Sequence, residues 1–160
     1  AMVDTDPRPA TGSASEAAMP AAPSCSIAAT LEVVGDRWTV LILRDVFRGV
    51  RRFAQLQADL GIARNMLADR LSRLGEHGVL ERVPYQTRPV RCEYRLTAKG
   101  ADLSTALIAL MGWGDRWYAA DGVPTILVHE TCGTPLEVRW FCSTCASIVD
   151  GTDATEERFL

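Results

Sequence analysis

A change in the spacing of apolar residues constrains the fold of this chain more than any other feature. Across residues 63–78, leucines recur at intervals of four and three, at Leu67, Leu71 and Leu74. This is the spacing of one buried face of a helix. Across 91–97, apolar and charged residues alternate, which is the period of a strand with one face in water. The chain is therefore predicted to pass from a helix into a β-hairpin.

Three further apolar stripes precede this helix, and one follows the hairpin. They predict helices at 25–34, 37–47, 53–60 and 98–119, with strands at 79–85 and 91–97 around a turn at 86–90. Asp36 and Thr97 stand where the second and last of these helices begin. Both residue types accept hydrogen bonds from the free backbone N–H groups at a helix start, so we expect both to be N-caps.

This order of elements is that of a winged helix-turn-helix. Short helices joined by a glycine-containing turn and followed by a basic hairpin form such a fold, so we expect a mainly α protein with a small β-hairpin wing (α+β). The chain divides into a flexible arm at 1–24, a winged-helix domain for DNA binding and dimerisation at 25–119, a small β segment at 120–150 and an acidic tail at 151–160. The small β segment is expected to resemble a zinc ribbon.

Charge is distributed unevenly, although the net charge is only −3. Residues 25–100 carry thirteen basic and eight acidic side chains, whereas residues 101–160 carry three basic and nine acidic ones. Sixteen of the seventeen basic residues are arginines, and arginine suits phosphate and guanine through its planar, forked guanidinium group. A basic region of this kind is typical of a surface that binds nucleic acid.

The polar face of the helix at 63–78 supplies the side chains that we expect to touch double-stranded DNA. In this fold the N-terminal part of that helix lies in the major groove, where Arg can bridge guanine and Asn can bridge adenine. The expected base or phosphate contacts on the helix are Arg64, Asn65, Ala68, Asp69 and Arg73. Contacts to phosphate alone are expected at Arg51, Arg52, Arg88 and Arg91.

Two neighbouring side chains of this helix have a structural interpretation as well. The spacing of Asp69 and Arg73 suits an ion pair along the helix. Arg70 flanks the buried leucines, so a structural salt bridge and a phosphate contact are both consistent with its position. The alternative for the whole polar face is an ordinary solvated helix surface.

An ordered set of residues between 25 and 119 resembles one family of regulators. The matching residues are Cys25, 35–39, 41–44, Gly49, Arg52, Phe53, Leu56, Leu67, Arg70, Leu71, Leu74, 78–80, 93–97 and Gly100. At these positions the sequence resembles the HxlR-type winged helix-turn-helix regulators of bacteria. The resemblance implies a cytoplasmic transcription regulator that forms a homodimer through its first and last helices. The run at 63–66 departs from the residues that commonly begin the family's recognition helix, so the operator sequence does not transfer.

The resemblance also bears on what signal the protein detects. Several family members respond to oxidants or electrophiles through a cysteine at the position of Cys25. A helix N-terminus favours the thiolate form, whereas an inert, half-buried thiol is the alternative. A small-molecule effector pocket between the wing and the last helix is a further hypothesis. The aromatic residues expected in the core and the dimer interface are Trp38, Phe53, Tyr94, Trp113 and Trp117.

The sharpest chemical motif lies after the last helix. Two residues separate His129 from Cys132, and two separate Cys142 from Cys145. Paired ligands of this spacing suit tetrahedral zinc with one His and three Cys ligands, and a bound ion would help so short a segment to fold. The alternatives are a disulfide among these cysteines, which a cytosolic location disfavours, and plain reduced thiols.

Two hypotheses of function follow. The first is a homodimeric transcription regulator, most simply a repressor, that binds a pseudo-palindromic operator and responds to an oxidant, an electrophile or a small ligand. The second is a zinc-held protein-interaction module on a winged-helix platform that does not read DNA. An enzyme is not expected, since the chain has two histidines and lacks a nucleophile elbow and a phosphate loop. No apolar run is long enough to span a membrane, which fits a bacterial cytoplasmic protein.

Overall fold

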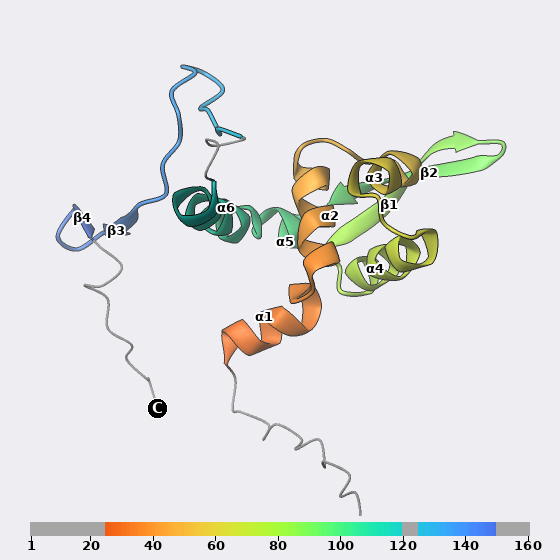
Figure 1. Ribbon diagram of the computed structural model, residues 1–160, viewed down its shortest axis with the longest axis horizontal. Helices are drawn as coiled ribbons and strands as arrows, with labels where there is room; N and C mark the ends of the chain where they lie inside the picture. The colour runs from red at the N-terminus through yellow and green to blue at the C-terminus, as the bar shows by residue number, and fades with distance from the viewer. Residues whose placement is uncertain (1–24, 120–124, 150–160) are drawn as a thin grey trace, which may run out of the picture.

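The computed structural model describes residues 25–119 and 125–149, so the expected arm at 1–24 and acidic tail at 151–160 lie outside the described residues. The elements are α1 (Ser26–Val34), α2 (Arg37–Phe47), α3 (Phe53–Leu60), α4 (Arg64–Glu76), β1 (Leu80–Thr87), β2 (Val90–Leu96), α5 (Ala98–Ala101), α6 (Ser104–Tyr118), β3 (Trp140–Cys142) and β4 (Ser147–Val149). Figure 1 shows α2, α3, α4 and α5 around the base of one long hairpin, with α1 and α6 farther from it. The predicted mainly α, winged helix-turn-helix fold is confirmed.

Both predicted N-caps are present. Asp36 Oδ1 accepts hydrogen bonds of 3.1 Å from the backbone N–H groups of Trp38 and Thr39 at the start of α2. Thr97 Oγ1 accepts from Gly100 N at 3.1 Å at the start of α5. Each cap satisfies backbone donors that have no partner inside their helix, and so fixes where the helix begins.

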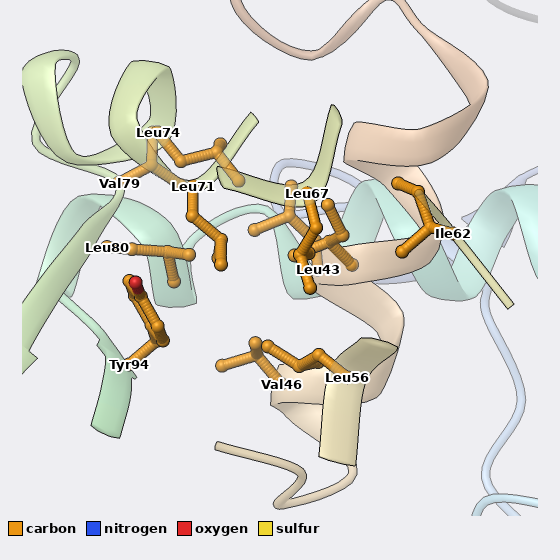
Figure 2. Close-up of a cluster of buried hydrophobic side chains, with 11 residues drawn as sticks. Leu43, Val46, Leu56, Ile62, Leu67, Leu71, Leu74, Val79, Leu80 and Tyr94 are labelled. Atoms are coloured by element: carbon orange, nitrogen blue, oxygen red, sulfur yellow. The ribbon is translucent and has the colours of Figure 1, made fainter. Parts of the chain in front are cut away.

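The core lies where α2, α3 and α4 meet the base of the hairpin (Figure 2). The predicted leucine stripe of α4 faces this core, and Leu67 is completely buried. Burying one such side chain stabilises a fold by about 1.5–3 kcal/mol, so the stripe fixes which face of α4 points outward. The buried apolar residues are Ile42, Leu43, Val46, Leu56, Ile62, Leu67, Leu71, Leu74, Val79, Leu80 and Tyr94.

The hairpin is longer than the sequence predicted. β1 and β2 pair antiparallel from Leu80 opposite Leu96 to Thr87 opposite Val90, with an irregularity between Pro84 and Gln86. The expected turn at 86–90 is therefore wrong, because cross-strand pairing continues to 87 and 90 and leaves only two residues between the strands. The extra length carries the end of the wing away from the core.

The helix expected at 98–119 is also wrong, because it is divided into α5 and α6. Gly100 is buried against the hairpin, where an added Cβ would lie 2.1 Å from the carbonyl oxygen of Val79. This close approach holds the single turn of α5 on the hairpin base, and α6 then runs away from it (Figure 1). No helix in 25–119 or 125–149 is long and apolar enough to cross a membrane.

The five aromatic residues that were expected in the core and the dimer interface divide between core and surface. Tyr94 is buried, and Trp38 and Phe53 pack against the core. Trp113 and Trp117, on α6, are 57% and 67% exposed in the single chain. α6 leaves the core before it reaches these two tryptophans, so of the two expected locations, core and dimer interface, the core is the one that does not apply to them.

Candidate nucleic-acid interface

The outer face of α4 carries the side chains that were predicted to contact DNA. The buried leucines hold one side of the helix against the core, so Arg64, Asn65, Ala68 and Asp69 are all exposed. Asn65 Oδ1 accepts a hydrogen bond of 2.9 Å from the backbone N–H of Met66, which leaves the amide NH2 as a donor. The first two turns of α4 thus present a polar surface at the place where this fold meets the major groove.

Arg64 is held over an aromatic ring at the start of α4. Its guanidinium carbon lies 5.3 Å from the centroid of Phe53, which itself packs against the core. Such a cation–π contact contributes roughly 0.5–1 kcal/mol at an exposed site and does not occupy the N–H donors. Arg64 makes no salt bridge with any residue that the structure describes, so its donors stay available to a base or a phosphate.

Arg70 ties α4 to the start of α2. Its Nε donates to Asp36 Oδ1 at 3.0 Å, and its Nη1 donates to Asp69 Oδ2 at 2.5 Å. Burial raises the pKa of Asp36, but the hydrogen bonds from Thr39 and from Arg70 outweigh it and hold the pKa below the usual value. The structural interpretation of Arg70 therefore agrees with the geometry, and the ion pair expected between Asp69 and Arg73 is wrong.

Arg73 makes its contact with a different helix. Its Nη2 donates to the backbone carbonyl of Glu32 near the end of α1 at 3.2 Å. A basic side chain at this place satisfies a carbonyl that lacks a partner within its own helix. Arg73 is half-buried and lies in the last turn of α4, so among the predicted contacts it is the one most engaged inside the protein.

The predicted phosphate contacts lie at two places along the hairpin. Arg88 and Arg91 are exposed at the far end of the wing. Arg51 and Arg52 lie at its base, where Arg51 O accepts from Tyr94 N at 2.7 Å and Arg52 forms an isolated β-bridge with Glu93. The backbone before α3 thus pairs with β2. This pairing fixes the direction in which the side chains of Arg51 and Arg52 extend.

Two residues of β1 join this surface without having been predicted. The guanidinium carbon of Arg52 lies 4.5 Å from the ring centroid of Tyr85, and Arg82 lies 6.0 Å from that of Tyr94. Tyr85 and Arg82 are exposed. Arg82 and Tyr85 are three positions apart, so strict alternation would place them on opposite faces of a strand, but the irregularity between Pro84 and Gln86 interrupts that alternation. Beside them, a cavity of about 590 Å³ lies between α4 and the hairpin, with Ala68, Leu71, Leu80 and Arg82 in its wall.

Cys25 lies directly before α1 as its N-cap residue. Its side chain makes no capping hydrogen bond, and the thiol is free and exposed. The half-buried thiol considered as an alternative is therefore not what the structure has. A cavity of about 530 Å³ also borders the last helix, but 125–127 and 136–140 line it opposite α6, not the wing as the effector hypothesis expected.

The four predicted metal ligands come together in two pairs. His129 Nδ1 lies 3.2 Å from Cys132 Sγ, and Cys132 Sγ lies 3.3 Å from Thr134 Oγ1. Hydrogen bonds from Thr134 and His129 lower the pKa of Cys132 to about 7. Bonds from Cys145 and Thr144 lower the pKa of Cys142. Within the described ranges, no three His, Cys, Asp or Glu side chains lie near enough to share one ion.

Comparisons with known proteins agree with this geometry. A family model described as HxlR-like helix-turn-helix matches residues 33–121. The HTH-type transcriptional regulator Rv3095 of Mycobacterium tuberculosis is 47% identical over 133 residues, which cover 82% of this chain and 84% of Rv3095. The crystal structure of PA1607, a candidate transcription factor, is similar with a TM-score of 0.76 and 38% identity, covering 85% of this chain and 96% of that one.

A redox regulator is among the similar structures as well. The reduced form of HypR matches with a TM-score of 0.54 and 27% identity, over 57% of this chain and 91% of HypR. All three proteins are described as regulators or transcription factors. The family model spans α2 to α6, which includes the recognition helix and the wing. The chain therefore belongs to the HxlR-like helix-turn-helix family of winged-helix transcriptional regulators.

Proposed function

We propose that this regulator binds a pseudo-palindromic operator as a homodimer and represses transcription from it. The observation that carries the proposal is the first half of α4, where a leucine-anchored helix presents Arg64, Asn65 and Ala68 to solvent. α4 and the wing lie on one side of the molecule, and α6 lies on the other (Figure 1). DNA and the second copy of the chain can therefore be engaged on different sides.

The contacts divide into two kinds. Arg64 and Asn65 lie in the first turn of α4 and suit bidentate bonds to guanine and adenine edges. Arg51, Arg52, Arg88 and Arg91 lie outside the recognition helix and suit phosphates, which position the protein without reading sequence. Arg73 and Asp69 are already bonded inside the protein, so we assign them a positioning role.

The dimer interface is assigned to α1 and α6, the helices that the family resemblance implies. Both expose large apolar side chains in the single chain, and contiguous exposed apolar surface is typical of an interface between proteins. The residues concerned are Ile27, Leu31, Leu110, Trp113, Trp117 and Tyr118. Two recognition helices related by a twofold axis then read half-sites about one helical turn apart, or a multiple of it.

The input signal is assigned to the Cys25 thiol. It is exposed and lies at the start of α1, so an oxidant or electrophile can reach it. A change at Cys25 acts directly on the helix that we place in the dimer interface. HypR, a similar structure, is described as a redox regulator, which supports a signal of this class.

The test is a selection of bound sequences from random DNA duplexes, followed by titration of the selected duplex with protein. Arg64→Ala should weaken binding by about 1–3 kcal/mol and relax the preference at one base position. Arg139→Ala is the matched control, because Arg139 bonds to Glu137 in the C-terminal segment. Binding by the unaltered chain should fall steeply with salt, since several phosphates are neutralised.

The outcomes separate the hypotheses. An inverted repeat whose affinity depends on Arg64 but not on Arg139 supports the proposal. Equal loss in both variants would contradict the assignment of α4 as the reading helix. No salt-sensitive binding to any duplex would favour the platform that binds protein instead of DNA. Loss of binding after oxidation, absent in Cys25→Ser, would assign the signal to that thiol.

A further inference from the structure

The C-terminal segment, residues 125–149, is ordered into two hairpins but has no buried side chain. Phe141 and Trp140 are both 65% exposed, and other large apolar residues of the segment are exposed with them. A short β unit with so little burial is rarely stable by apolar packing alone. Disulfides or metal ions commonly supply the additional stability. Its cysteines are free, so a metal ion is the alternative to consider.

The first hairpin carries one pair of metal-binding residues at its tip. Leu136 N donates to Leu127 O at 2.8 Å, and His129 N donates to Thr134 O at 2.8 Å. These bonds bring the chain back on itself, and Gly133 N closes the turn on His129 O at 2.7 Å. The turn places His129 and Cys132 side by side on the same loop.

The second hairpin repeats this arrangement. β3 pairs with β4 from Trp140 opposite Val149 to Cys142 opposite Ser147, so Cys142 ends β3 and Cys145 lies in the connecting turn. The residue after the second ligand of each pair has a left-handed backbone, with φ of 69° at Gly133 and 51° at Ala146. Such a φ is unfavourable for alanine. Both turns therefore share a left-handed residue directly after the second ligand, although only one of them has glycine at this position.

The ligand atoms of the first pair lie close to the separation that two zinc ligands require. With Zn–N near 2.05 Å and Zn–S near 2.3 Å, two ligands at a tetrahedral angle lie about 3.6 Å apart. His129 Nδ1 and Cys132 Sγ are 3.2 Å apart, so a small opening admits the ion.

We propose that the two hairpins close on one zinc ion held by His129, Cys132, Cys142 and Cys145. The pairs lie apart in this structure, and residues 137–139 between the hairpins belong to no strand, so this stretch can bend to bring them together. Four protein ligands leave no open position on the metal, which makes the ion structural and not catalytic. The three thiols bind as thiolates and release their protons to solvent.

The test uses the full chain, reduced, stripped of metal with a chelator and titrated with Co²⁺. Tetrahedral cobalt with thiolate ligands absorbs visible light strongly, whereas hydrated cobalt does not. The expected result is this absorption at one Co²⁺ per chain, removed by added Zn²⁺. Cys142→Ser should abolish it. Cys92→Ser, which changes a half-buried cysteine of the wing, is the matched control and should retain it.

Counting reactive thiols gives a second measurement that needs no variant. Of the five cysteines, the three assigned ligands should resist alkylation when Zn²⁺ is present and react after chelation, while Cys25 reacts in both states. No visible absorption with Co²⁺, one ion per two chains, or equal alkylation with and without Zn²⁺ would each overturn the proposal. DNA binding is measured separately, so failure here does not depend on the proposed regulatory function.

Discussion

In the winged-helix body, residues 25–119, the large apolar side chains of α2, α3 and α4 turn inward, whereas those of the C-terminal segment face solvent. Leu56 and Leu67 have no exposed surface, but Phe141 is 65% exposed. Burial of apolar area is the main favourable term in folding, so the body is stabilised by its core and the segment is not. The comparison teaches that hydrogen-bonded hairpins can give order to a backbone without fixing how the hairpins sit together.

The two regions differ in charge as well. Residues 25–119 carry fourteen basic and ten acidic side chains, whereas residues 125–149 carry one basic and two acidic ones. Phosphate attracts a basic surface, which agrees with placing the proposed DNA contacts on the body and not on the C-terminal segment. The core therefore positions the proposed DNA contacts, and the segment is free to carry a separate property such as the proposed zinc site.

The largest expected effect comes from opening a cavity in the core. Leu67→Ala removes a fully buried side chain of α4 and should lower the free energy of unfolding by about 2–5 kcal/mol. Urea unfolding followed by far-ultraviolet circular dichroism measures this loss. A cost below about 1 kcal/mol would contradict the view that α4 is held mainly by its leucines.

A smaller effect is expected where a polar contact, not the core, positions α4. Asp36→Ala removes the N-cap of α2 and the partner of Arg70, and loss of a cap costs about 0.5–2 kcal/mol. The matched control is Asp69→Ala, which removes the other, exposed partner of Arg70 but no cap, and should cost less than about 0.5 kcal/mol. Equal costs in urea unfolding would mean that the cap contributes nothing measurable.

The Asp36 carboxylate should make the free energy of unfolding depend on pH, and its lowered pKa sets the direction of that dependence. The pKa of Asp36 is lowered from its ordinary value of 3.8 in the folded protein, so the folded state favours the ionised form. Its contribution to stability is complete above pH 3.8 and is lost as pH falls through the lower, folded-state pKa. The difference in unfolding free energy between the unaltered chain and Asp36→Asn should therefore shrink in acid. If the difference in unfolding free energy grew below pH 4 instead, the result would contradict a lowered pKa of Asp36 in the folded protein.

The body could be predicted from sequence because its signals are local. The spacing of Leu67, Leu71 and Leu74 fixes the buried face of α4, and Asp36 and Thr97 are recognisable caps within three residues of their partners. The division of α5 from α6 could not be predicted, since it depends on how closely Gly100 approaches Val79. That contact is formed by tertiary packing and leaves no periodic signal.

The residues of the candidate site could be predicted from the sequence, but the contacts that they make could not. Exposure of Arg64 follows from the helix period, but the partners of Arg70 and Arg73 lie 34 and 41 residues away in the sequence. In the C-terminal segment, spacing placed His129 beside Cys132 correctly. The spacing within a pair says nothing about the distance between two hairpins, which is why the complete zinc site stays a proposal.

The smallest expected effect tests the C-terminal segment itself. Phe141→Ala removes a side chain that contacts little of its own chain, so the unfolding free energy of the body should change by less than about 0.5 kcal/mol. The measurement is urea unfolding at two protein concentrations tenfold apart, beside Leu67→Ala. A loss near 2 kcal/mol that changes with concentration would mean that Phe141 is buried against a second copy, because stability coupled to association depends on protomer concentration. A similar loss at both concentrations would mean that the segment has a packed core within one chain. Either result would contradict the view that the body buries its large apolar side chains and the C-terminal segment does not.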